Sequence, residues 1–554
     1  MRSRLRPASV LAASGLAVSC IALTIGGSRA EAVTQASGST SAQAPVITAK
    51  SVTALSKPSV TSTSIPPLGP GSCASSVAVV TPSGPKSLPT NVIRSTDDSI
   101  PLYLDQWSAG CGERITIRLG AAHSAKAVVR AYRIGWYGGA GSRLVWSSAP
   151  IRIPATPMTT RSKPTISSPN WKTNITTKIT SNWAPGLYAI VTSSGGRVTG
   201  VAEFVVRSSS PQSAVVVYSG LTNASYSPFG GASLYRGLDG GSLATTVALQ
   251  RPLILNGRVS FLKHDVPTAQ ALDRVGIRAD AVMDTDVHST PSLLTSRNLV
   301  VLPGHSEYWT KSMYDALLTA QSAGTNIAVL GANEIYWQAR VQMNSLGQPV
   351  SMFVARKLAK DPLAVTTPAL ATVRWRDAPL RHDPSASLGE SYTVTKAHGS
   401  LQILSLPGWL AATTGLRSGA ILQGVAAGEV DGPRVAPSIW MPTNLQVIGL
   451  GLLRGPAGRV ATAGMTYYTA PSGSAVFQFG STNWACQLMA TCPDGITSTQ
   501  TRQIQWALTT SVVHNLSQRG WGRAHPSTPN APKSISAMHS ALSPAAYGTF
   551  GAGS

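Results

Sequence analysis

The sequence predicts an α/β fold combined with an all-β part: an N-terminal β-sandwich, then a domain built on a doubly wound parallel sheet, then a β extension. Three observations lead to this prediction. Short strand-like segments separated by turns fill residues 73–208. Apolar strands alternate with helical patterns within residues 212–516, as is typical of a parallel sheet. Strand-like segments then return from about residue 365.

The first part has the pattern expected of a sandwich. Residues Arg114–Leu119 alternate between polar and apolar side chains, as a strand with one buried face does. Three further segments are strand-like: Val128–Ile134, Leu187–Val191 and Glu203–Val206. Glycine pairs at 138–139 and 195–196 mark turns between them. Short strands at this spacing favour two packed antiparallel sheets.

The second part alternates strands and helices. Its expected strands are Ala214–Tyr218, Ala279–Met283, Leu299–Leu302 and Asn326–Leu330, and its expected helices are Thr268–Val275 and Thr310–Ser322. These helices stop near Gly276 and Gly324, and glycine is common just past a helix end. The later strands are Gln446–Gly449, Gly464–Tyr468 and Ala475–Gly480, and a helix within 496–516 closes the domain.

Both ends of the chain lie outside these domains. Residues 1–32 resemble a secretion signal, because arginines precede an apolar stretch and a small-x-small site at Ala30–Ala32. A retained membrane anchor and a lipid attached to Cys20 are the alternatives. Residues 33–72 have the composition of a flexible linker, and residues 520–554 are expected to be a disordered tail. We therefore expect a secreted or envelope-associated protein with no membrane segment beyond the signal.

The chain is strongly basic. It has 45 Lys and Arg against 22 Asp and Glu, a formal charge of +23, and its hydrophobic content of 43% is sufficient for folded cores. The signal carries a net +3, so the rest of the chain keeps +20. Such a charge favours contact with polyanions, including cell-envelope polymers. The basic residues are dispersed rather than clustered, so a specific nucleic-acid site is not expected.

Four cysteines follow the signal: Cys73, Cys111, Cys486 and Cys492. In an oxidising compartment an even number suggests two disulfides. Proximity in the sequence favours pairing Cys73 with Cys111 and Cys486 with Cys492. Four reduced, buried thiols are the alternative. The cysteines are too scattered for a zinc cluster.

Two expected strands are followed by related sequences. Leu299–Leu302 precedes Pro-Gly-His-Ser-Glu-Tyr-Trp, and Asn326–Leu330 precedes Gly-Ala-Asn-Glu-Ile-Tyr-Trp. Open α/β sheets bind ligands beyond the carboxyl ends of their strands, so both segments should face one crevice. The candidate residues there are His305, Glu307, Tyr308, Asn333, Glu334 and Tyr336. Asp284, Asp286 and His288 follow the preceding strand and could reach the same crevice.

Several common catalytic motifs are absent. The chain has no G-x-S-x-G motif, which would supply a serine nucleophile, and no H-E-x-x-H zinc motif. No cysteine lies between Cys111 and Cys486, so a cysteine nucleophile on one of the sheet strands is excluded. Oxygen donors and imidazole suit several metals. Tyrosine suits Fe³⁺, because a trivalent ion can hold a phenolate well below its free pKa of about 10. Packing is the alternative role of a Tyr-Trp pair, and turn formation is the alternative role of Asp284 and Asp286.

Several longer segments share the pattern of one known family. They are Gly304–Trp309, Gly331–Trp337, Ala470–Trp484, Tyr226–Tyr235 and Tyr132–Gly139. Together they resemble the C-terminal domain of the large (beta) subunit of N,N-dimethylformamidase, from about residue 128 to about residue 515. The resemblance implies a glutamine-amidotransferase-like α/β domain. It also implies an amidohydrolase whose single iron is held by two tyrosines and one glutamate.

On this resemblance the expected iron ligands are Tyr308, Tyr336 and Glu429, with Glu307 and Glu334 as alternatives to Glu429. His305 or Glu307 would transfer protons, since each lies within a few residues of an expected ligand. The family's amidase also has a small partner subunit and no export signal. This chain has an export signal, and nothing in it resembles that partner.

Two functions of different classes follow. The first is a secreted, metal-dependent amidohydrolase in which a metal-bound water attacks the carbonyl of a C–N bond. The second is a non-catalytic cell-envelope-binding protein, in which the sandwich and the positive surface make the contacts and the α/β domain is a scaffold.

Overall fold

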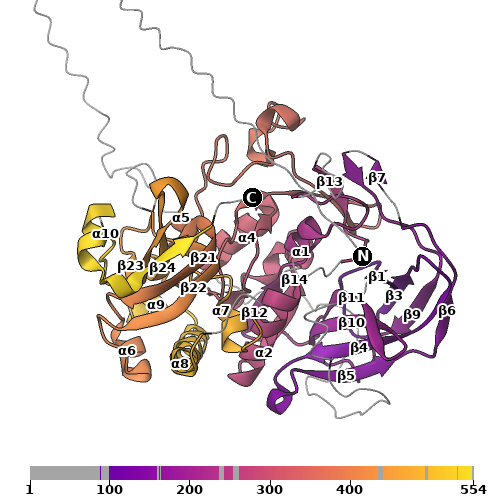
Figure 1. Cartoon of the computed structure of the whole chain (residues 1–554), viewed down its shortest axis with the longest axis horizontal. Coiled ribbons are helices and arrows are strands. Elements are labelled where there is room, and N and C mark those ends of the chain that lie inside the picture. Colours follow the sequence, from indigo (N-terminus) through magenta and orange to yellow (C-terminus); the bar gives the residue numbers. More distant parts are fainter. Residues whose placement is uncertain are drawn as a thin grey trace, which may run out of the picture. The chain divides into compact units, whose positions relative to one another are not determined.

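The computed structural model describes residue 88 and residues 99–551, except 159–160, 163, 236–242, 254–260, 435–440, 493–496 and 533–534. The expected signal peptide, the linker and Cys73 lie outside the described residues. The fold is mixed α/β, with many strands in several sheets and few helices (Figure 1). Within the described part of the chain, no helix combines the length and apolar character needed to cross a membrane.

Two sheets near the N-terminus share one apolar core. The first has the order β1 (Leu102–Leu104), β3 (Arg114–Leu119), β9 (Asn174–Lys178). The second has the order β2 (Ser108–Ala109), β11 (Arg197–Val206), β10 (Gly186–Ser194), β4 (Ala125–Ile134), β5 (Ser142–Ser147), and β6 (Ile151–Ile153) also pairs with β4. The alternation in β3 is confirmed, because Ile115 and Ile117 are buried in the core with Phe204 of β11.

The expected parallel strands form one continuous sheet. Its order is β14 (Ala279–Met283), β12 (Ala214–Tyr218), β15 (Leu299–Leu302), β17 (Asn326–Val329), β25 (Ala475–Gln478), and each neighbouring pair is parallel. All residues of β12, β15 and β17 are buried, which explains why these strands are continuous apolar runs rather than alternating ones.

Helices follow several of these strands. They are α1 (Gly220–Tyr226), α2 (Val266–Arg274), α3 (Asp284–Ser289), α4 (Lys311–Ser322), α7 (Trp484–Leu488) and α8 (Thr499–Leu516). A single turn of π-helix, Phe261–Asp265, precedes α2. Side-chain caps begin two of the predicted helices: the Thr310 hydroxyl accepts from the Met313 N–H, and the Ser498 hydroxyl accepts from the Thr501 N–H.

The expected β extension is present and joins the same sheet through β25. The added strands, in order, are β24 (Val460–Thr469), β23 (Gln446–Arg454), β26 (Tyr547–Phe550), β21 (Ser391–Ile403) and β22 (Ile421–Gly432). They are orange and yellow in Figure 1. Two further short helices in this region are α5 (Ser385–Leu388) and α6 (Gly408–Thr414).

The prediction of a disordered tail over residues 520–554 was wrong for its described residues. They form α9 (Trp521–Ala524), α10 (Ile535–Ala541) and β26, which pairs with β21 and β23. Phe550 is 6% exposed and packs so closely that a Cβ at Gly455 would lie 2.1 Å from its ring. The Pro- and Ala-rich composition suggested disorder, although the segment contains the short strand β26, with Tyr547 and Phe550, which pairs within the sheet.

Two small sheets lie beside the main one. The first has the order β19 (Arg340–Met343), β20 (Pro349–Phe353), β13 (Thr246–Ala248), β8 (Thr165–Ile166), β7 (Arg161–Ser162). The second is the parallel pair β16 (Tyr308–Trp309) and β18 (Trp337–Gln338).

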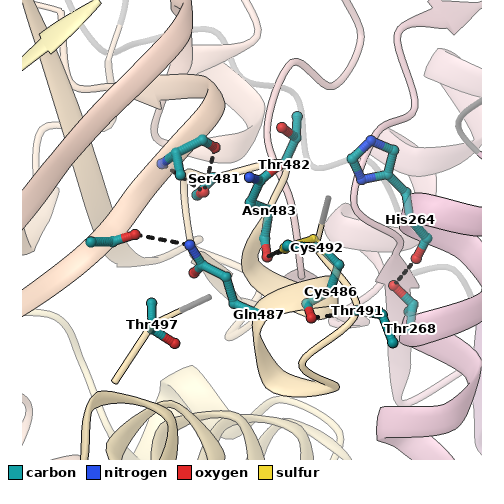
Figure 2. Close-up of a disulfide and its surroundings, with 12 residues drawn as sticks. His264, Thr268, Ser481, Thr482, Asn483, Cys486, Gln487, Thr491, Cys492 and Thr497 are labelled. Atoms are coloured by element: carbon teal, nitrogen blue, oxygen red, sulfur yellow. Dashed lines mark hydrogen bonds between the residues drawn. A yellow bond between two sulfur atoms is a disulfide. The ribbon is translucent and has the colours of Figure 1, made fainter. Parts of the chain in front are cut away.

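The predicted disulfide between Cys486 and Cys492 is confirmed, and it links α7, which contains Cys486, to the segment that follows the helix (Figure 2). Cys111 is also disulfide-bonded. Its expected partner, Cys73, lies outside the described residues.

Candidate active site

The two related strand ends lie side by side. Beyond β15 and β17 the backbones approach so closely that a Cβ at Gly331 would lie 2.3 Å from the Gly304 oxygen. The backbone N–H of Tyr336 donates to the backbone oxygen of Glu307 at 2.9 Å, and Tyr308 pairs with Trp337 in the β16–β18 ladder. The two segments therefore form one edge, as the sequence pattern predicts.

Glu307 is the centre of a buried cluster. The Tyr226 hydroxyl donates to its Oε2 at 2.7 Å, and the Tyr235 hydroxyl donates to its Oε1. The two tyrosine rings are stacked with their centroids 4.5 Å apart. The Glu307 N–H donates to the Thr222 hydroxyl at 2.9 Å, which fixes the backbone against α1. Burial raises the pKa of the Glu307 carboxyl above its usual value.

His305 lies between two carboxylates. Its Nε2 is 3.4 Å from Oε2 of Glu429 and 3.6 Å from Oε2 of Glu307. Burial lowers the pKa of His305, but the charges of Glu429 and Glu307 outweigh it and leave the pKa above its usual value. Burial conversely raises the pKa of Glu429, while His305 and Asn333 outweigh that effect and leave it lowered. The pair therefore favours a protonated imidazole beside an ionised carboxylate.

Asn333 holds Glu429 in place. Its Nδ2 donates to Oε2 of Glu429 at 2.6 Å, and its backbone N–H donates to Oδ1 of Asp431 at 2.8 Å. Asn333 has a positive φ of 56°, a conformation that Asn tolerates better than most residues. The Glu429 side chain is 24% exposed, so the cluster meets solvent on this side.

Tyr308 and Tyr336, the expected iron ligands, each accept a hydrogen bond from an arginine, and Tyr308 also lies against Tyr235 of the Glu307 cluster. The Tyr308 hydroxyl accepts from Nη2 of Arg356 at 3.2 Å, and its ring lies edge-on to that of Tyr235. Burial raises the pKa of Tyr308. The Tyr336 hydroxyl accepts from Nη2 of Arg376 at 3.4 Å.

The remaining candidates are Glu334, Asp284, Asp286 and His288. Glu334 is 2% exposed and burial raises its pKa well above the usual value. Asp284 accepts the Leu221 N–H at the start of α1, and Asp286 accepts the Met283 N–H at the start of α3. His288 contacts Thr310. Asp284, Asp286 and His288 therefore hold structural positions. The two aspartates lie in α3 rather than in the turn that was their alternative role, and Asp286 also pairs with Arg207.

Sequence reasoning did not nominate Tyr226 and Tyr235 as site residues. Both occur in the segment Y-S-P-F-G-G-A-S-L-Y, which carried part of the family resemblance. The available signal was that this segment begins and ends with a tyrosine. They reach Glu307 because α1 and the loop after it cover the end of β15, which lies far away in the sequence.

The donor types suit a ferric ion better than a zinc ion. Among the described residues, no group of three or more His, Cys, Asp or Glu side chains is arranged to hold a metal. Two phenols and one carboxylate do converge, at Tyr226, Tyr235 and Glu307. This hard oxygen set matches the ligand types that the family resemblance implies.

Comparison with solved structures gives only partial, distant matches. A Pseudomonas fluorescens alkylpurine DNA glycosylase AlkC bound to DNA containing an abasic site analogue is 16% identical, with 22% of this chain and 34% of that chain covered and a TM-score of 0.15. An uncharacterised protein from Bacillus anthracis is 16% identical, with 19% and 79% covered and a TM-score of 0.13. A β-glucosidase from Listeria innocua is 16% identical, with 19% and 16% covered and a TM-score of 0.13. This chain thus spans about a third of the glycosylase.

No curated protein matches the chain. A family model does match: that of N,N-dimethylformamidase beta subunit-like proteins, C-terminal domain, over residues 128–496. This range includes the buried tyrosine–glutamate cluster, the His305–Glu429 pair and most of the continuous sheet. The chain therefore belongs to the N,N-dimethylformamidase beta subunit-like, C-terminal family.

Proposed function

We propose that this protein is an exported amidohydrolase that cleaves a C–N bond at the cluster formed by His305, Glu307 and Glu429. The family match supports amidohydrolase-like activity in broad terms. The observation that carries the proposal is the position of His305 Nε2 within 3.4–3.6 Å of two carboxylates. The wider fold assignment, an N-terminal β-sandwich followed by a glutamine-amidotransferase-like domain, belongs to the same proposal.

His305 would carry the proton. A group that transfers protons near neutral pH must accept and release them readily, and imidazole does so. Glu429 stabilises the protonated ring, and Asn333 orients Glu429 through its 2.6 Å hydrogen bond. A water molecule would attack the carbonyl carbon and give a proton to the Glu307 carboxylate, and Nε2 would deliver its own proton to the nitrogen of the departing amine as the C–N bond breaks. Tyr226 and Tyr235 hold Glu307 in one orientation by donating to its two oxygens.

A ferric ion is the cofactor that the family resemblance implies, and two sets of residues could hold it. The sequence-based set is Tyr308, Tyr336 and Glu429. The second set has the same donor types and consists of Tyr226, Tyr235 and Glu307. When bound, the ion would act as a Lewis acid on the amide carbonyl.

An iron-loading experiment tests the cofactor and separates the two sets. Purified protein given Fe³⁺ should develop a visible phenolate charge-transfer absorption. The four tyrosines are then changed to phenylalanine one at a time: Tyr308, Tyr336, Tyr226 and Tyr235. Loss of colour in one pair only identifies that pair as the ligands. Tyr314→Phe is the matched control, because this buried tyrosine lies on α4 and packs against Trp375 instead.

Release of dimethylamine from N,N-dimethylformamide and of ammonia from acetamide, measured on the same samples, tests the activity. The amidohydrolase proposal fails if the iron-loaded wild-type protein releases no amine above the rate of free Fe³⁺. If the protein stays colourless but still hydrolyses amides, the iron cofactor is rejected and the amidohydrolase proposal stands.

The charge of +20 outside the signal supports a second candidate, a non-catalytic protein that binds anionic cell-envelope polymers. Purified cell walls should then retain the protein at low salt and release it as ionic strength rises. Retention by an inactive, colourless protein would favour this candidate.

A further inference from the structure

A cavity lies apart from the tyrosine–glutamate cluster. It has a volume of about 440 Å³, within the range of small-molecule binding sites. Its walls come from the segment 105–108 between β1 and β2, from α3 and from the turn between β19 and β20. The N-terminal sheets and the parallel-sheet region therefore both contribute side chains to it.

The charged groups in this cavity already compensate one another. Asp105 forms an ion pair with Arg118 at 2.8 Å. Arg207 pairs with Glu113 at 3.1 Å and with Asp286 at 3.4 Å. The cavity lining itself has three carboxylates and one guanidinium group, that of Arg207; Arg118 lies outside the lining and neutralises Asp105, so the charges taken together leave a single net negative charge. An anion would therefore meet carboxylates, and an apolar ligand would remove them from water without replacing their hydrogen bonds.

The other polar walls are rich in acceptors and hydroxyls. Gln250 uses its Nε2 on the backbone oxygen of Pro349 at 2.7 Å, which leaves its amide oxygen as an acceptor. Gln106, Ser289 and Thr290 add further side-chain amide and hydroxyl groups. Such a wall matches a ligand that has many O–H donors and no charge.

Among the described residues that line the cavity, Trp107 is the one with an aromatic side chain. Its indole is half-buried and packs against Gly220, where an added Cβ would lie 2.7 Å from the ring. The ring is thus held rigidly. A fixed aromatic ring beside polar planar side chains is suited to the C–H face and the hydroxyl edge of a pyranose.

We propose that this cavity binds a neutral saccharide unit. Its hydroxyls would donate to the carboxylate and amide oxygens, and its ring would lie against Trp107. The site is independent of the proposed amide hydrolysis, because neither the tyrosine–glutamate cluster nor His305 contributes to it.

Calorimetry and saturation-transfer NMR on the full chain test the proposal. The probes are cellobiose, maltose and N,N′-diacetylchitobiose as neutral saccharides, with putrescine and inorganic phosphate as charged competitors. Ser289→Trp should block the cavity, because Ser289 is an exposed lining residue that can accept a larger side chain. The matched control is Ser292→Trp, an exposed position just after α3 that does not line the cavity.

The expected result is millimolar or tighter binding of at least one saccharide, lost in Ser289→Trp and retained in Ser292→Trp. Gln106→Ala should weaken that binding roughly fivefold, the effect of losing one hydrogen bond of about 1 kcal/mol. The proposal is overturned if no saccharide of the panel binds at millimolar concentration. It is equally overturned if only putrescine or phosphate binds, or if Ser289→Trp binds the saccharide as the wild type does.

Discussion

Nε2 of His305 lies 3.4 Å from Oε2 of Glu429, although one residue follows β15 and the other lies in β22. This contact joins the end of the parallel sheet to the antiparallel extension. It also reverses the effect of burial on the imidazole, whose pKa is raised instead of lowered. The antiparallel extension therefore contributes directly to the chemistry proposed for the parallel strands.

The first prediction concerns His305. His305→Gln should lower amide hydrolysis by about a hundredfold or more, because glutamine cannot carry a proton between substrate and carboxylate. The measurement is the rate of amine release at neutral pH. His288→Gln is the control, since His288 contacts Thr310 outside the cluster, and it should leave the rate unchanged. Equal rates in the wild type and in His305→Gln would exclude His305 as the proton carrier.

The second prediction concerns Asp431, which anchors Asn333. Burial raises the pKa of Asp431 to about 7, above its ordinary value of 3.8. The folded chain therefore binds this proton more tightly than the unfolded chain does. The resulting stabilisation is complete below pH 3.8 and is lost as the pH rises through about 7. Asp431→Asn should reduce the slope of unfolding free energy against pH in this window.

Asn at position 431 resembles the protonated acid and can still accept the Asn333 N–H. Gln478, whose Nε2 now donates to Asp431, can turn its amide to offer the oxygen. Part of the slope should remain, because burial also raises the pKa of Asp265 to about 7. Asp377→Asn, in an exposed pair with Arg374, is the control and should leave the slope unchanged. Denaturant unfolding at several pH values measures it, and an unaltered slope in Asp431→Asn would contradict the assignment.

The parallel strands could be predicted from the sequence because burial on both faces requires continuous apolar runs. The same reasoning placed the two Tyr-Trp segments at one edge of the sheet. Helix α1 was not predicted. Six of its seven residues are buried, and they include the polar residues Thr222, Asn223 and Ser225, so the apolar residues show no helical spacing. Residues 547–550 escaped because a four-residue strand depends on its partners rather than on its own pattern.

The candidate site was predictable only in part. His305 and Glu307 follow a strand end, and Glu429 was chosen from the family resemblance; the three do lie together. The contacts of Tyr226 and Tyr235 with Glu307 depend on the path of the chain after β12. Strand patterns fix where a sheet ends but not which distant loop covers that end. Tertiary contacts alone bring these hydroxyls to the carboxylate.

The third prediction concerns the Cys486–Cys492 disulfide, whose sulfur atoms lie beside the backbone oxygen of Asn483 (Figure 2). The cysteines are separated by 6 positions, and a loop of this size should stabilise the fold by about 2 kcal/mol. Replacing both by serine should therefore lower the unfolding free energy by about that amount. Denaturant unfolding in oxidising buffer measures the change. A reducing agent should shift the wild-type midpoint in the same direction, and an unmoved midpoint for the double variant would contradict the prediction.

The last prediction concerns the buried ion pair of Asp361 with Arg340, whose Nη2 and Nη1 lie 2.8 Å from Oδ1 and Oδ2. Burial raises the pKa of Asp361, but Arg340 and Thr372 outweigh it and lower the pKa to about 2. The stabilisation is therefore complete above the ordinary pKa of 3.8, amounts to about 2 kcal/mol, and is lost as the pH falls through about 2. Asp361→Asn should lower the unfolding free energy at pH 7 by at least about 2 kcal/mol.

Asp315→Asn provides the comparison, because its pair with Lys311 is about half exposed and should contribute under about 1 kcal/mol. Equal losses in the two variants would mean that the bidentate geometry around Asp361 does not stabilise the fold.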